Sequence, residues 1–496
     1  MRGLSVSQSS ATKTAGEAAD EAQGELYDFL VVSNRLPVDR VEEASGSGWR
    51  RSPGGLVTAL APVMEKSDGA WVGWHGAPDE VLEPFEHEGI TILPVPLTAQ
   101  EVENYYEGFS NATLWPLYHD VIAPPEFHRA WWDSYQRVNQ RFADAAAERA
   151  AEGATVWVQD YQLQLVPAML RRLRPDLKIG FFNHIPFPPQ EIFAQLPWRR
   201  QVLEGLLGAD LLGFQRPNDA ANFARAARRY ARAAGKGSRL VVTDPAHDGE
   251  WSPRERTVRA EAFPISIDTA RISELAERPE IIERARQIRH DLGDPTTIML
   301  GVDRLDYTKG IRHRLKAFEE LLTDGRARVG DVTLIQVASP SRERVEQYRI
   351  LREEIEGTVG RINGTFDTMQ HTAVRYLHHS YPVEEMVALY LAADVMLVTA
   401  LRDGMNLVAK EYVAARRDGT GALVLSEFAG AADQLKQALL VNPHDIAGLK
   451  DAITTAISLP RGVAARRMKA MRRQIVVHNV EEWSASFLAR LKEVCP

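Results

Sequence analysis

The sequence predicts an α/β protein of two doubly wound domains with a cleft between them. Three observations predict this fold class. The chain has 496 residues, more than a single hydrophobic core accommodates, so two domains are expected. Short apolar segments alternate with helical stretches, which is typical of parallel sheets covered by helices on both faces. The alternation then starts again near residue 296, where the strands of a second domain are expected.

The first half of the chain contains four predicted strands, at residues 28–33, 155–159, 178–182 and 210–214. Each is a short apolar segment that is followed by a helical stretch. A helix is also predicted to open at Gly54-Gly55, because apolar residues from Leu56 to Met64 follow at helical spacing. Residues 1–26 lack the apolar core of a signal peptide and are predicted to form a disordered tail.

The second half repeats the pattern, with predicted strands at residues 296–300, 332–336, 395–398 and 422–425. A polar, irregular region at 244–256 precedes a predicted domain boundary at 263–268. We therefore expect a first domain over residues 27–265 and a second domain over residues 266–478. Residues 479–496 are expected to form a C-terminal helix that returns to the first domain.

Composition argues against several classes of function. A formal net charge of −8 argues against a nucleic acid or an anionic membrane as the partner. Cys495 is the one cysteine of the sequence, so neither an intramolecular disulfide nor a cysteine-based metal site is expected. No apolar run approaches the length of a membrane span. The expected location is the cytoplasm.

The segment 401–411 carries the strongest functional signal. It follows the predicted strand at 395–398, and Asp403 and Gly404 form the predicted turn before a helix. The first amides of a helix have no acceptor within the helix and favour an anion. Glu411 lies eight residues after Asp403, a little over two helical turns, so both carboxylates can border one cleft. This pattern predicts a sugar-nucleotide site; the alternative is a capped helix with a solvated Glu.

Polar residues also follow the predicted strands of the first half. Arg35 comes after the first strand, and its guanidinium suits the geometry of a phosphate. Gly54-Gly55 would let a phosphate or a sugar approach the backbone closely. Asp160 and His184 follow two strands that are expected to be neighbours, so the two side chains are predicted to border one site. A purely structural His184 is the alternative.

Cations follow the strands of the second half. Arg304 and Lys309 come after the strand at 296–300 and are predicted to hold a diphosphate, while Arg342 follows the strand at 332–336. Solvated surface cations are the alternative. The sequence has neither a Gly-x-Gly-x-x-Gly fingerprint nor a Walker-type loop, which argues against a nicotinamide dehydrogenase and a kinase. No metal-ligand spacing is found, and a metal is not required if the two cations neutralise a leaving diphosphate.

Several motifs taken together resemble the trehalose-6-phosphate synthases, the retaining glycosyltransferases of family 20. They are Ser33-Asn34-Arg35-Leu36-Pro37, Tyr105-Tyr106 with Phe109-Ser110-Asn111 and Leu114-Trp115-Pro116, Asn183-His184-Ile185-Pro186-Phe187-Pro188, Asp303-Arg304-Leu305-Asp306-Tyr307-Thr308-Lys309-Gly310, Gly360-Arg361-Ile362-Asn363-Gly364 and the segment 401–411. The resemblance spans about residues 30–440. It implies two Rossmann-like domains in the GT-B glycosyltransferase fold. The implied reaction moves glucose from a nucleotide donor to glucose 6-phosphate with retention, without a metal or a cofactor.

The resemblance also implies roles on the donor side of the site. Arg304 and Lys309 would hold the donor diphosphate, and Glu411 would take the ribose hydroxyls. The donor glucose would be held by Asp403 and by the backbone of the residues that follow it, namely Met405, Asn406, Leu407 and Val408. Gly55 would lie near the reacting centre. The first domain is thereby expected on the acceptor side and the second domain on the nucleotide-sugar side.

On the acceptor side, the resemblance implies that Asp160 binds hydroxyls and that His184 lies at the donor glucose and assists transfer. The rest of this side, its phosphate pocket included, would be formed by Arg35, Tyr106, Trp115 and Arg342. The expected catalytic residues are His184, Asp160, Arg304, Lys309 and Asp403. The family often has His-Asp-Tyr where this chain has Gln159-Asp160-Tyr161, which leaves the role of the first side chain open.

The sequence leaves some alternatives. Another transferase of the same fold, such as a glycogen-synthase-like enzyme, would share the second-half motifs without needing a first-half phosphate pocket. A catalytically silent sugar-phosphate sensor would be expected to lose site residues, and this chain retains them. Ribose and diphosphate contacts do not distinguish UDP, ADP and GDP, and UDP-glucose is the first expectation. A homo-oligomer, either a dimer or a tetramer, is also expected.

Overall fold

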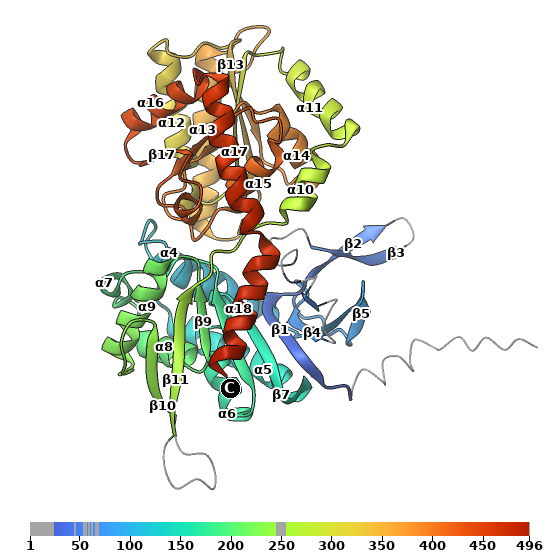
Figure 1. Ribbon diagram of the computed structural model, residues 1–496, viewed down its shortest axis with the longest axis vertical. Coiled ribbons are helices and arrows are strands. Elements are labelled where there is room, and N and C mark those ends of the chain that lie inside the picture. Colours follow the sequence, from blue (N-terminus) through green and yellow to red (C-terminus); the bar gives the residue numbers. More distant parts are fainter. Residues whose placement is uncertain are drawn as a thin grey trace, which may run out of the picture.

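The computed structural model describes residues 24–43, 46–52, 57, 60, 63–64, 69–244 and 254–495. The helix predicted at Gly54-Gly55 and the predicted N-terminal tail up to residue 23 lie outside these described residues. Figure 1 shows two domains, one above the other, each built on a sheet with helices against its faces. The α/β, doubly wound fold class predicted from the sequence is confirmed.

The first domain contains a sheet of nine described strands in the order β10-β11-β9-β8-β7-β1-β4-β6-β5. The bounds are β1 Tyr27–Arg35, β4 Gly69–Trp74, β5 Phe85–His87, β6 Ile90–Pro94, β7 Ala150–Gln159, β8 Lys178–Asn183, β9 Leu211–Phe214, β10 Arg239–Asp244 and β11 Arg254–Ala262. The central strands β1, β4, β7, β8 and β9 pair in parallel. Strands β1, β4, β8 and β9 are almost entirely buried, and the middle of each is apolar, as expected for strands covered on both faces. A separate antiparallel pair is formed by β2 Val38–Glu43 and β3 Gly46–Arg51.

The helices of the first domain precede or follow its strands. Their bounds are α3 Ala99–Glu101, η1 Val102–Leu114, α4 Trp115–Tyr118, α5 Arg129–Arg149, η2 Tyr161–Leu163, α6 Val166–Leu173, α7 Gln190–Phe193, α8 Arg199–Leu206 and α9 Pro217–Tyr230. Thr98 and Glu101 form a capping box before η1, a π-helical segment. The Glu101 carboxylate is also held by both terminal nitrogens of Arg141, at 2.8 Å each. This anchored start fixes the segment that carries Tyr106 and leads into Trp115.

The second domain contains a sheet of six described strands in the order β14-β13-β12-β15-β16-β17, all parallel. The strands are β12 Thr297–Arg304, β13 Val332–Ser339, β14 Val374–Leu377, β15 Val395–Val398, β16 Ala422–Ser426 and β17 Leu439–Val441. Its helices are α10 Thr269–Leu275, α11 Pro279–Asp291, η3 Tyr307–Lys309, α12 Ile311–Thr323, α13 Glu346–Phe366, α14 Val383–Ala392, α15 Leu407–Ala415, η4 Gly430–Asp433, α16 Ile446–Ile457 and α17 Arg461–Val477. The last described helix of the chain is α18 Val480–Val494.

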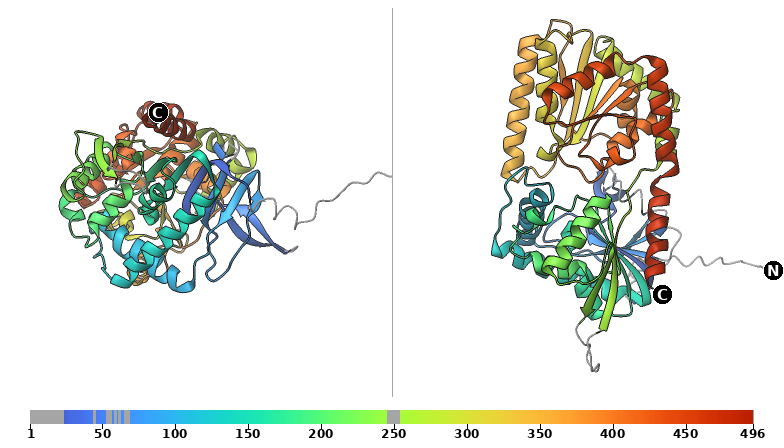
Figure 2. Two further views of the ribbon diagram at one scale, coloured as in Figure 1. Left: turned by 90° about the horizontal axis from the view of Figure 1, so that it is seen from below. Right: turned by 60° about the vertical axis from the view of Figure 1, so that its left-hand side comes forward.

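The last two helices connect the two domains (Figures 1 and 2). Helix α17 packs on α15 of the second domain, whereas α18 packs on β8 and β9 of the first. The Phe487 ring of α18 stacks on the Trp157 ring of β7 at a centroid distance of 4.4 Å. Arg490 makes two bonds to the Glu261 carboxylate, at 2.8 and 2.9 Å. The C-terminal helix therefore forms part of the core of the first domain.

The structure corrects the expectation that the first sheet is parallel throughout. Strand β10 runs antiparallel to β11, and β5 runs antiparallel to β6, at the two edges of the sheet. The polar region predicted as irregular at 244–256 includes the last residue of β10 and the first residues of β11. These edge strands are partly solvated and alternate polar with apolar residues, so they lack the continuous apolar character that identifies a buried strand.

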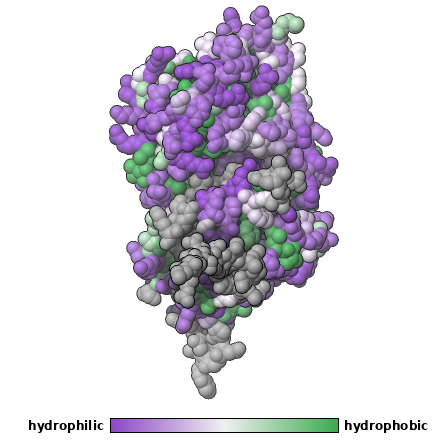
Figure 3. Space-filling view, turned by 90° about the vertical axis from the view of Figure 1, so that its right-hand side faces the viewer, coloured by the Kyte–Doolittle hydropathy of each residue, from purple (hydrophilic) through white to green (hydrophobic). Residues whose placement is uncertain are grey.

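Among the described residues, no helix is both long and apolar enough to cross a membrane. The face shown in Figure 3 is mostly hydrophilic, and its hydrophobic residues are scattered.

Candidate active site

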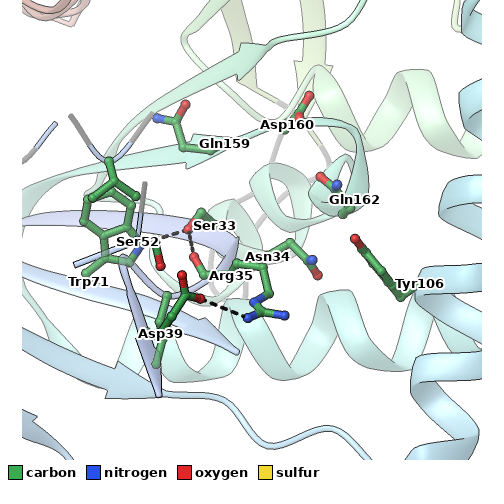
Figure 4. Close-up of a pocket in the computed structure, with 12 residues that line it drawn as sticks. Ser33, Asn34, Arg35, Asp39, Ser52, Trp71, Tyr106, Gln159, Asp160 and Gln162 are labelled. Carbon is green, nitrogen blue, oxygen red and sulfur yellow. Dashed lines mark hydrogen bonds and ion pairs between the residues drawn. The ribbon is translucent and has the colours of Figure 1, made fainter. Parts of the chain in front are cut away.

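Two adjacent cavities lie beyond the carboxyl ends of the central strands, where ligands of doubly wound folds bind. The first, here called the β1 cavity, has a volume of about 350 Å³ and is lined by residues of β1 and of the loop after β7 (Figure 4). The second, here called the interdomain cavity, has a volume of about 230 Å³ and is lined by both domains. Tyr106, Asp160 and Gln162 line both cavities, so the two are continuous along one wall.

The interdomain cavity brings together most of the residues predicted from the sequence. The first domain contributes Tyr106, Trp115, Asp160 and His184, and the second domain contributes Arg304, Lys309, Arg342 and Asp403. The two domains approach closely here, because a Cβ atom at Gly404 would lie 2.4 Å from the carbonyl oxygen of His184. Glycine at this position therefore allows the loop after β15 to pack against the loop after β8.

Lys309 and Asp403 form a direct ion pair in the cavity wall. The Lys309 ammonium lies 2.6 Å from Oδ2 of Asp403, and both side chains are largely buried. Burial, the largest single effect, raises the pKa of the Asp403 carboxyl. The charge and hydrogen bond of Lys309, together with the hydrogen bond from Asn406, outweigh it and hold this pKa below its usual value. Asp403 is therefore ionised and paired with a cation.

Helix α15 begins three residues after the predicted turn at Asp403-Gly404. Asn406 is its N-cap, in the left-handed region at φ 78°, and the side-chain oxygen of Asn406 accepts from the Ala409 amide. The Met405 amide is oriented toward Oδ1 of Asp403, at 3.4 Å. Leu407 and Val408 form the start of the helix, where backbone amides have no acceptor within the helix.

Glu411 lies on α15 and faces α14, not the interdomain cavity. Its carboxylate accepts a hydrogen bond of 2.7 Å from the hydroxyl of Tyr390. Burial raises the pKa of Glu411, and the Tyr390 hydroxyl offsets only part of that effect. The structure thus places Glu411 beside the first turn of the helix that also carries the Leu407 and Val408 amides.

Trp115 is covered by two guanidinium groups. Arg342 lies over the indole ring with its Cζ 3.8 Å from the ring centroid, and the Cζ of Arg304 lies 5.2 Å from the same centroid. Arg342 is buried and also pairs with Oδ2 of Asp306 at 3.1 Å. Burial raises the pKa of the Asp306 carboxyl, but the neighbouring cations, Arg342 first, lower it to about 2. Arg304 is exposed at the end of β12 and remains accessible to a ligand.

Asp160 has an unusual backbone conformation. Its φ of 71° and ψ of 170° lie outside the regions that non-glycine residues favour, a kind of strain that clusters at functional sites. Its amide donates to the Phe182 carbonyl at 2.7 Å, and its Oδ1 accepts from the His184 amide at 3.0 Å. The structure therefore brings Asp160 and His184 into contact. Burial raises the pKa of Asp160 to about 6.

The His184 ring is a neutral group in this cavity. Burial lowers its pKa to about 3. Its Nε2 lies 2.9 Å from Oε1 of Gln159, the residue just before Asp160. A second neutral imidazole, His119, was missed by sequence reasoning; it lies four residues after Trp115 and its Nδ1 is 2.7 Å from the Trp115 carbonyl oxygen. Burial also lowers the pKa of His119 to about 3.

Arg35 lies in the β1 cavity, apart from Arg342. The Arg35 side chain is 47% exposed, stacks over Trp74 at 5.3 Å and pairs with Asp39 at 3.4 Å (Figure 4). Gly76, at φ +104°, leaves room for the guanidinium, because a Cβ there would lie 2.4 Å from it. The two arginines therefore approach the shared wall of Tyr106 and Asp160 from different cavities. Gly55, predicted near the reacting centre, lies outside the described residues.

In the part of the chain that the structure describes, no three His, Cys, Asp or Glu side chains gather where they could hold a metal ion. The positive charge in the interdomain cavity comes instead from Arg304, Lys309 and Arg342.

Comparisons with known proteins agree with this architecture. The model of glycosyltransferase family 20 matches residues 27–493. A trehalose-6-phosphate synthase of Mycobacterium sp. (strain JLS) is 57% identical over 467 residues, which cover 94% of this chain and 96% of that protein. A trehalose-6-phosphate synthase of Mycolicibacterium vanbaalenii is 56% identical over 484 residues, covering 96% of this chain and 98% of that protein.

Comparison with solved structures indicates the same family. A crystal structure of a UDP-forming α,α-trehalose-phosphate synthase from Burkholderia xenovorans in complex with glucose 6-phosphate superimposes with a TM-score of 0.83 at 35% identity, covering 94% of this chain and 99% of that chain. A structure from E. coli bound with UDP-2-fluoro glucose superimposes with a TM-score of 0.82 at 33% identity, with coverages of 94% and 99%. The resemblance inferred from the motifs is confirmed, and so is the GT-B fold. The chain belongs to glycosyltransferase family 20.

Proposed function

We propose that this chain transfers glucose from UDP-glucose to glucose 6-phosphate with retention, forming α,α-trehalose 6-phosphate and UDP. The observation that carries the proposal is the interdomain cavity, in which three cations of one domain face hydroxyl-binding groups of the other. The relatives named above are trehalose-6-phosphate synthases, and those with solved structures include a complex with glucose 6-phosphate and one with UDP-2-fluoro glucose.

On the donor side, Arg304 and Lys309 would bind the diphosphate and stabilise the negative charge that develops as it leaves. Lys309 is held by Asp403 at 2.6 Å, and this ion pair positions its ammonium. The donor diphosphate would bind the same ammonium, and Asp403 would accept hydrogen bonds from hydroxyls of the transferred glucose. The amides of Leu407 and Val408 support this assignment, since they lie at a helix start beside Asp403. The backbone of Met405 and Asn406 would also bind the donor glucose, and Glu411 would bind the ribose hydroxyls. His184, which lines the interdomain cavity, would lie at the donor glucose and assist transfer.

On the acceptor side, Asp160 and Tyr106 would bind the sugar of glucose 6-phosphate, because they line both cavities. Arg35 and Arg342 would bind its phosphate from the two sides, and Trp115 would hold the Arg342 guanidinium in place. Gly55 is proposed near the reacting centre, although the structure does not describe it. The acceptor would then contact both domains and favour their approach.

In the transfer step, the bond between the anomeric carbon and the diphosphate oxygen breaks, and a bond to the acceptor hydroxyl forms on the same face. The hydroxyl proton passes to an oxygen of the leaving UDP. The alternative route to retention is a covalent intermediate on a carboxylate. Asp160 and Asp403 are the carboxylates of the interdomain cavity, and both already bind protein donors, His184 and Lys309 respectively.

The test is an assay of nucleoside diphosphate release with UDP-, ADP- and GDP-glucose, each with glucose 6-phosphate supplied or withheld. We expect release that requires glucose 6-phosphate and is fastest with UDP-glucose. A glycogen-synthase-like enzyme would release diphosphate with a glucan and not with glucose 6-phosphate. A silent sensor would bind both ligands and release nothing.

Two further properties are proposed for the whole chain. Assembly into a homo-dimer or homo-tetramer is proposed, and light scattering of the purified chain tests it. A cytoplasmic location is proposed from the sequence, and fractionation of producing cells tests it.

A further inference from the structure

Gln159 is a buried side chain that the proposed mechanism does not use. It ends β7 and has no exposed surface, and its Oε1 lies 2.9 Å from Nε2 of His184. The next residue, Asp160, accepts from the backbone amide of the same histidine at 3.0 Å. Two consecutive residues therefore hold one histidine, Gln159 at the ring and Asp160 at the backbone.

The chemistry of this contact fixes the ring tautomer. An amide oxygen only accepts hydrogen bonds, so Nε2 of His184 must carry the proton that is donated to Gln159. In a neutral imidazole the other nitrogen, Nδ1, then has the free lone pair. The rings of Phe182 and Trp483 pack beside His184, with centroids at 4.6 and 6.1 Å, and this apolar packing keeps the ring uncharged.

The other charged groups that line the cavity contact partners of their own and form no described ion pair with the His184 ring. The carboxylates that line it are Asp160, which binds the His184 amide, and Asp403, which binds Lys309. The cations are Arg304, Lys309 and Arg342, and His119 is a second neutral imidazole. Tyr106 and Tyr161 are the phenols of the same wall. Among the described residues, no ion pair involves the His184 ring, so its hydrogen bond to Gln159 is its polar contact within the protein.

We propose that Gln159 is a positioning residue that holds His184 as the neutral, Nε2-protonated tautomer, so that the ring offers an acceptor to a hydroxyl of the transferred glucose. This inference rests on the proposed function, which places His184 at the donor sugar. It also gives a role to the position at which this chain has Gln instead of the more frequent His. A glutamine cannot change its charge with pH, so the tautomer is kept over the whole working range.

Two substitutions at Gln159 separate positioning from packing. Gln159→Met keeps the length of the side chain but removes the acceptor, and we expect a fall in kcat of about 10- to 100-fold, typical of the loss of a partner that orients a catalytic group, with KM changed less. Gln159→Glu keeps an acceptor but adds negative charge, which stabilises the imidazolium. We expect most of the activity at neutral pH and a rise of about 1 unit or more in the pKa of the His184 ring, read from its ¹⁵N shifts in an acid titration.

Gln215 provides the matched control, because its amide contacts the same histidine at the backbone carbonyl, at 3.4 Å, and not at the ring. Gln215→Met should leave the pKa of the His184 ring where it is in the unmodified enzyme. Wild-type kcat in Gln159→Met, or an unchanged pKa of the His184 ring in Gln159→Glu, would overturn the proposal. A ring pKa that shifts equally in Gln215→Met would also overturn it, since the effect would then not come from the ring contact.

A measurement without turnover keeps this inference distinct from the proposed function. In the ¹⁵N spectrum of histidine-labelled protein, with His184→Gln used for assignment, His184 should be neutral and protonated at Nε2. An Nδ1-protonated ring would contradict the inference, whatever the enzyme catalyses. Failure of the proposed function would instead appear as absent product formation by the unmodified chain, with the tautomer unchanged.

Discussion

The two walls of the interdomain cavity use charge in opposite ways. On the second-domain wall, Asp403 pairs with Lys309 and Asp306 pairs with Arg342, and the cations lower the pKa of both carboxyls. On the first-domain wall, burial dominates: the pKa of Asp160 is raised to about 6, and the pKa of His184 is lowered to about 3. One wall is thus fixed in its charged state, whereas the other combines a neutral imidazole with a carboxyl that titrates near pH 6.

This difference matches the two kinds of ligand chemistry in the proposed reaction. A leaving diphosphate gains negative charge and is stabilised by cations that are already in place. Sugar hydroxyls are neutral and need oriented donors and acceptors, which a dry wall of Asp160, His184 and Tyr106 supplies. The comparison predicts that substitutions on the second-domain wall act on the leaving group, whereas those on the first-domain wall act on sugar binding and on the pH dependence.

The largest effect is expected from loss of the second-domain cations. Arg304→Ala or Lys309→Ala should each reduce kcat by about 10²- to 10³-fold, as for removal of one group that stabilises developing charge. Arg312→Ala is the control, because Arg312 lies on the adjoining helix α12 in an exposed pair with Glu354. Circular dichroism verifies the fold of each variant. Near-normal turnover in both cavity variants would contradict the assignment of Arg304 and Lys309 to the leaving diphosphate.

Asp403→Asn tests whether the second-domain wall also binds the sugar. A charged hydrogen bond contributes about 1.5–3 kcal/mol, so binding of a non-reactive glucosyl donor should weaken by about that amount. Binding of UDP alone should weaken less, because the neutral amide of the substituted side chain still leaves Lys309 free for the phosphates. Calorimetry with both ligands measures the two losses, and equal losses would move Asp403 away from the glucose.

The ionisation of Asp160 on the first-domain wall should determine how kcat/KM depends on pH. Asp160 becomes protonated as the pH falls through about 6, so kcat/KM should decline there, whereas His184 and His119, with pKa values of about 3, should add no limb in this range. The phosphate of glucose 6-phosphate titrates near the same pH, with a second pKa of about 6. The profile is therefore also measured with plain glucose as the acceptor. A flat profile with glucose well below pH 6 would contradict the raised pKa of Asp160.

A smaller effect is expected on stability, and its sign follows from the same pKa. Because folding raises the pKa of the Asp160 carboxyl, its contribution to stability is fully present below the pKa of the unfolded chain and is lost as pH rises through about 6. Asp160→Asn should therefore raise the melting temperature at neutral pH while greatly reducing transfer. The stabilisation should shrink on acidification. A variant that is less stable than the wild type at neutral pH would contradict this account.

The sequence predicts the buried part of the fold well. The predicted strand at 395–398 coincides with β15, and the cores of β1, β7, β8, β12, β13 and β16 lie where short apolar runs indicate them. The edge strands β5 and β10 were not predicted, because partial solvation leaves them with mixed polarity. The three-residue edge strand β17 and the buried strand β4, whose apolar run is interrupted by glycines, were also missed, since each has only a short apolar run. The parallel order of the inner strands follows from the alternation with helices, but the antiparallel edges do not.

For the site, the sequence indicates which side chains follow strands but not how they pair. Lys309 and Asp403 are 94 residues apart, and no local pattern predicts that they form an ion pair of 2.6 Å. The same holds for Arg342 on Trp115, which depends on how the two domains meet. His119 is distinguished in the sequence only by lying four residues after Trp115, the spacing at which its ring reaches the Trp115 carbonyl. The sequence distinguishes Gln159 only as a departure from the family pattern, in which this position is often His.

The central claim is that the donor diphosphate and the acceptor phosphate are bound by different cations, Lys309 with Arg304 for the first and Arg35 with Arg342 for the second. Arg35 and Lys309 line different cavities, which makes them the sharpest pair to compare. Calorimetric titration of Lys309→Ala and Arg35→Ala with UDP and with glucose 6-phosphate tests the claim directly. We predict that Lys309→Ala loses UDP affinity and keeps glucose 6-phosphate affinity, and that Arg35→Ala does the reverse. Equal losses of both ligands in both variants would contradict the account.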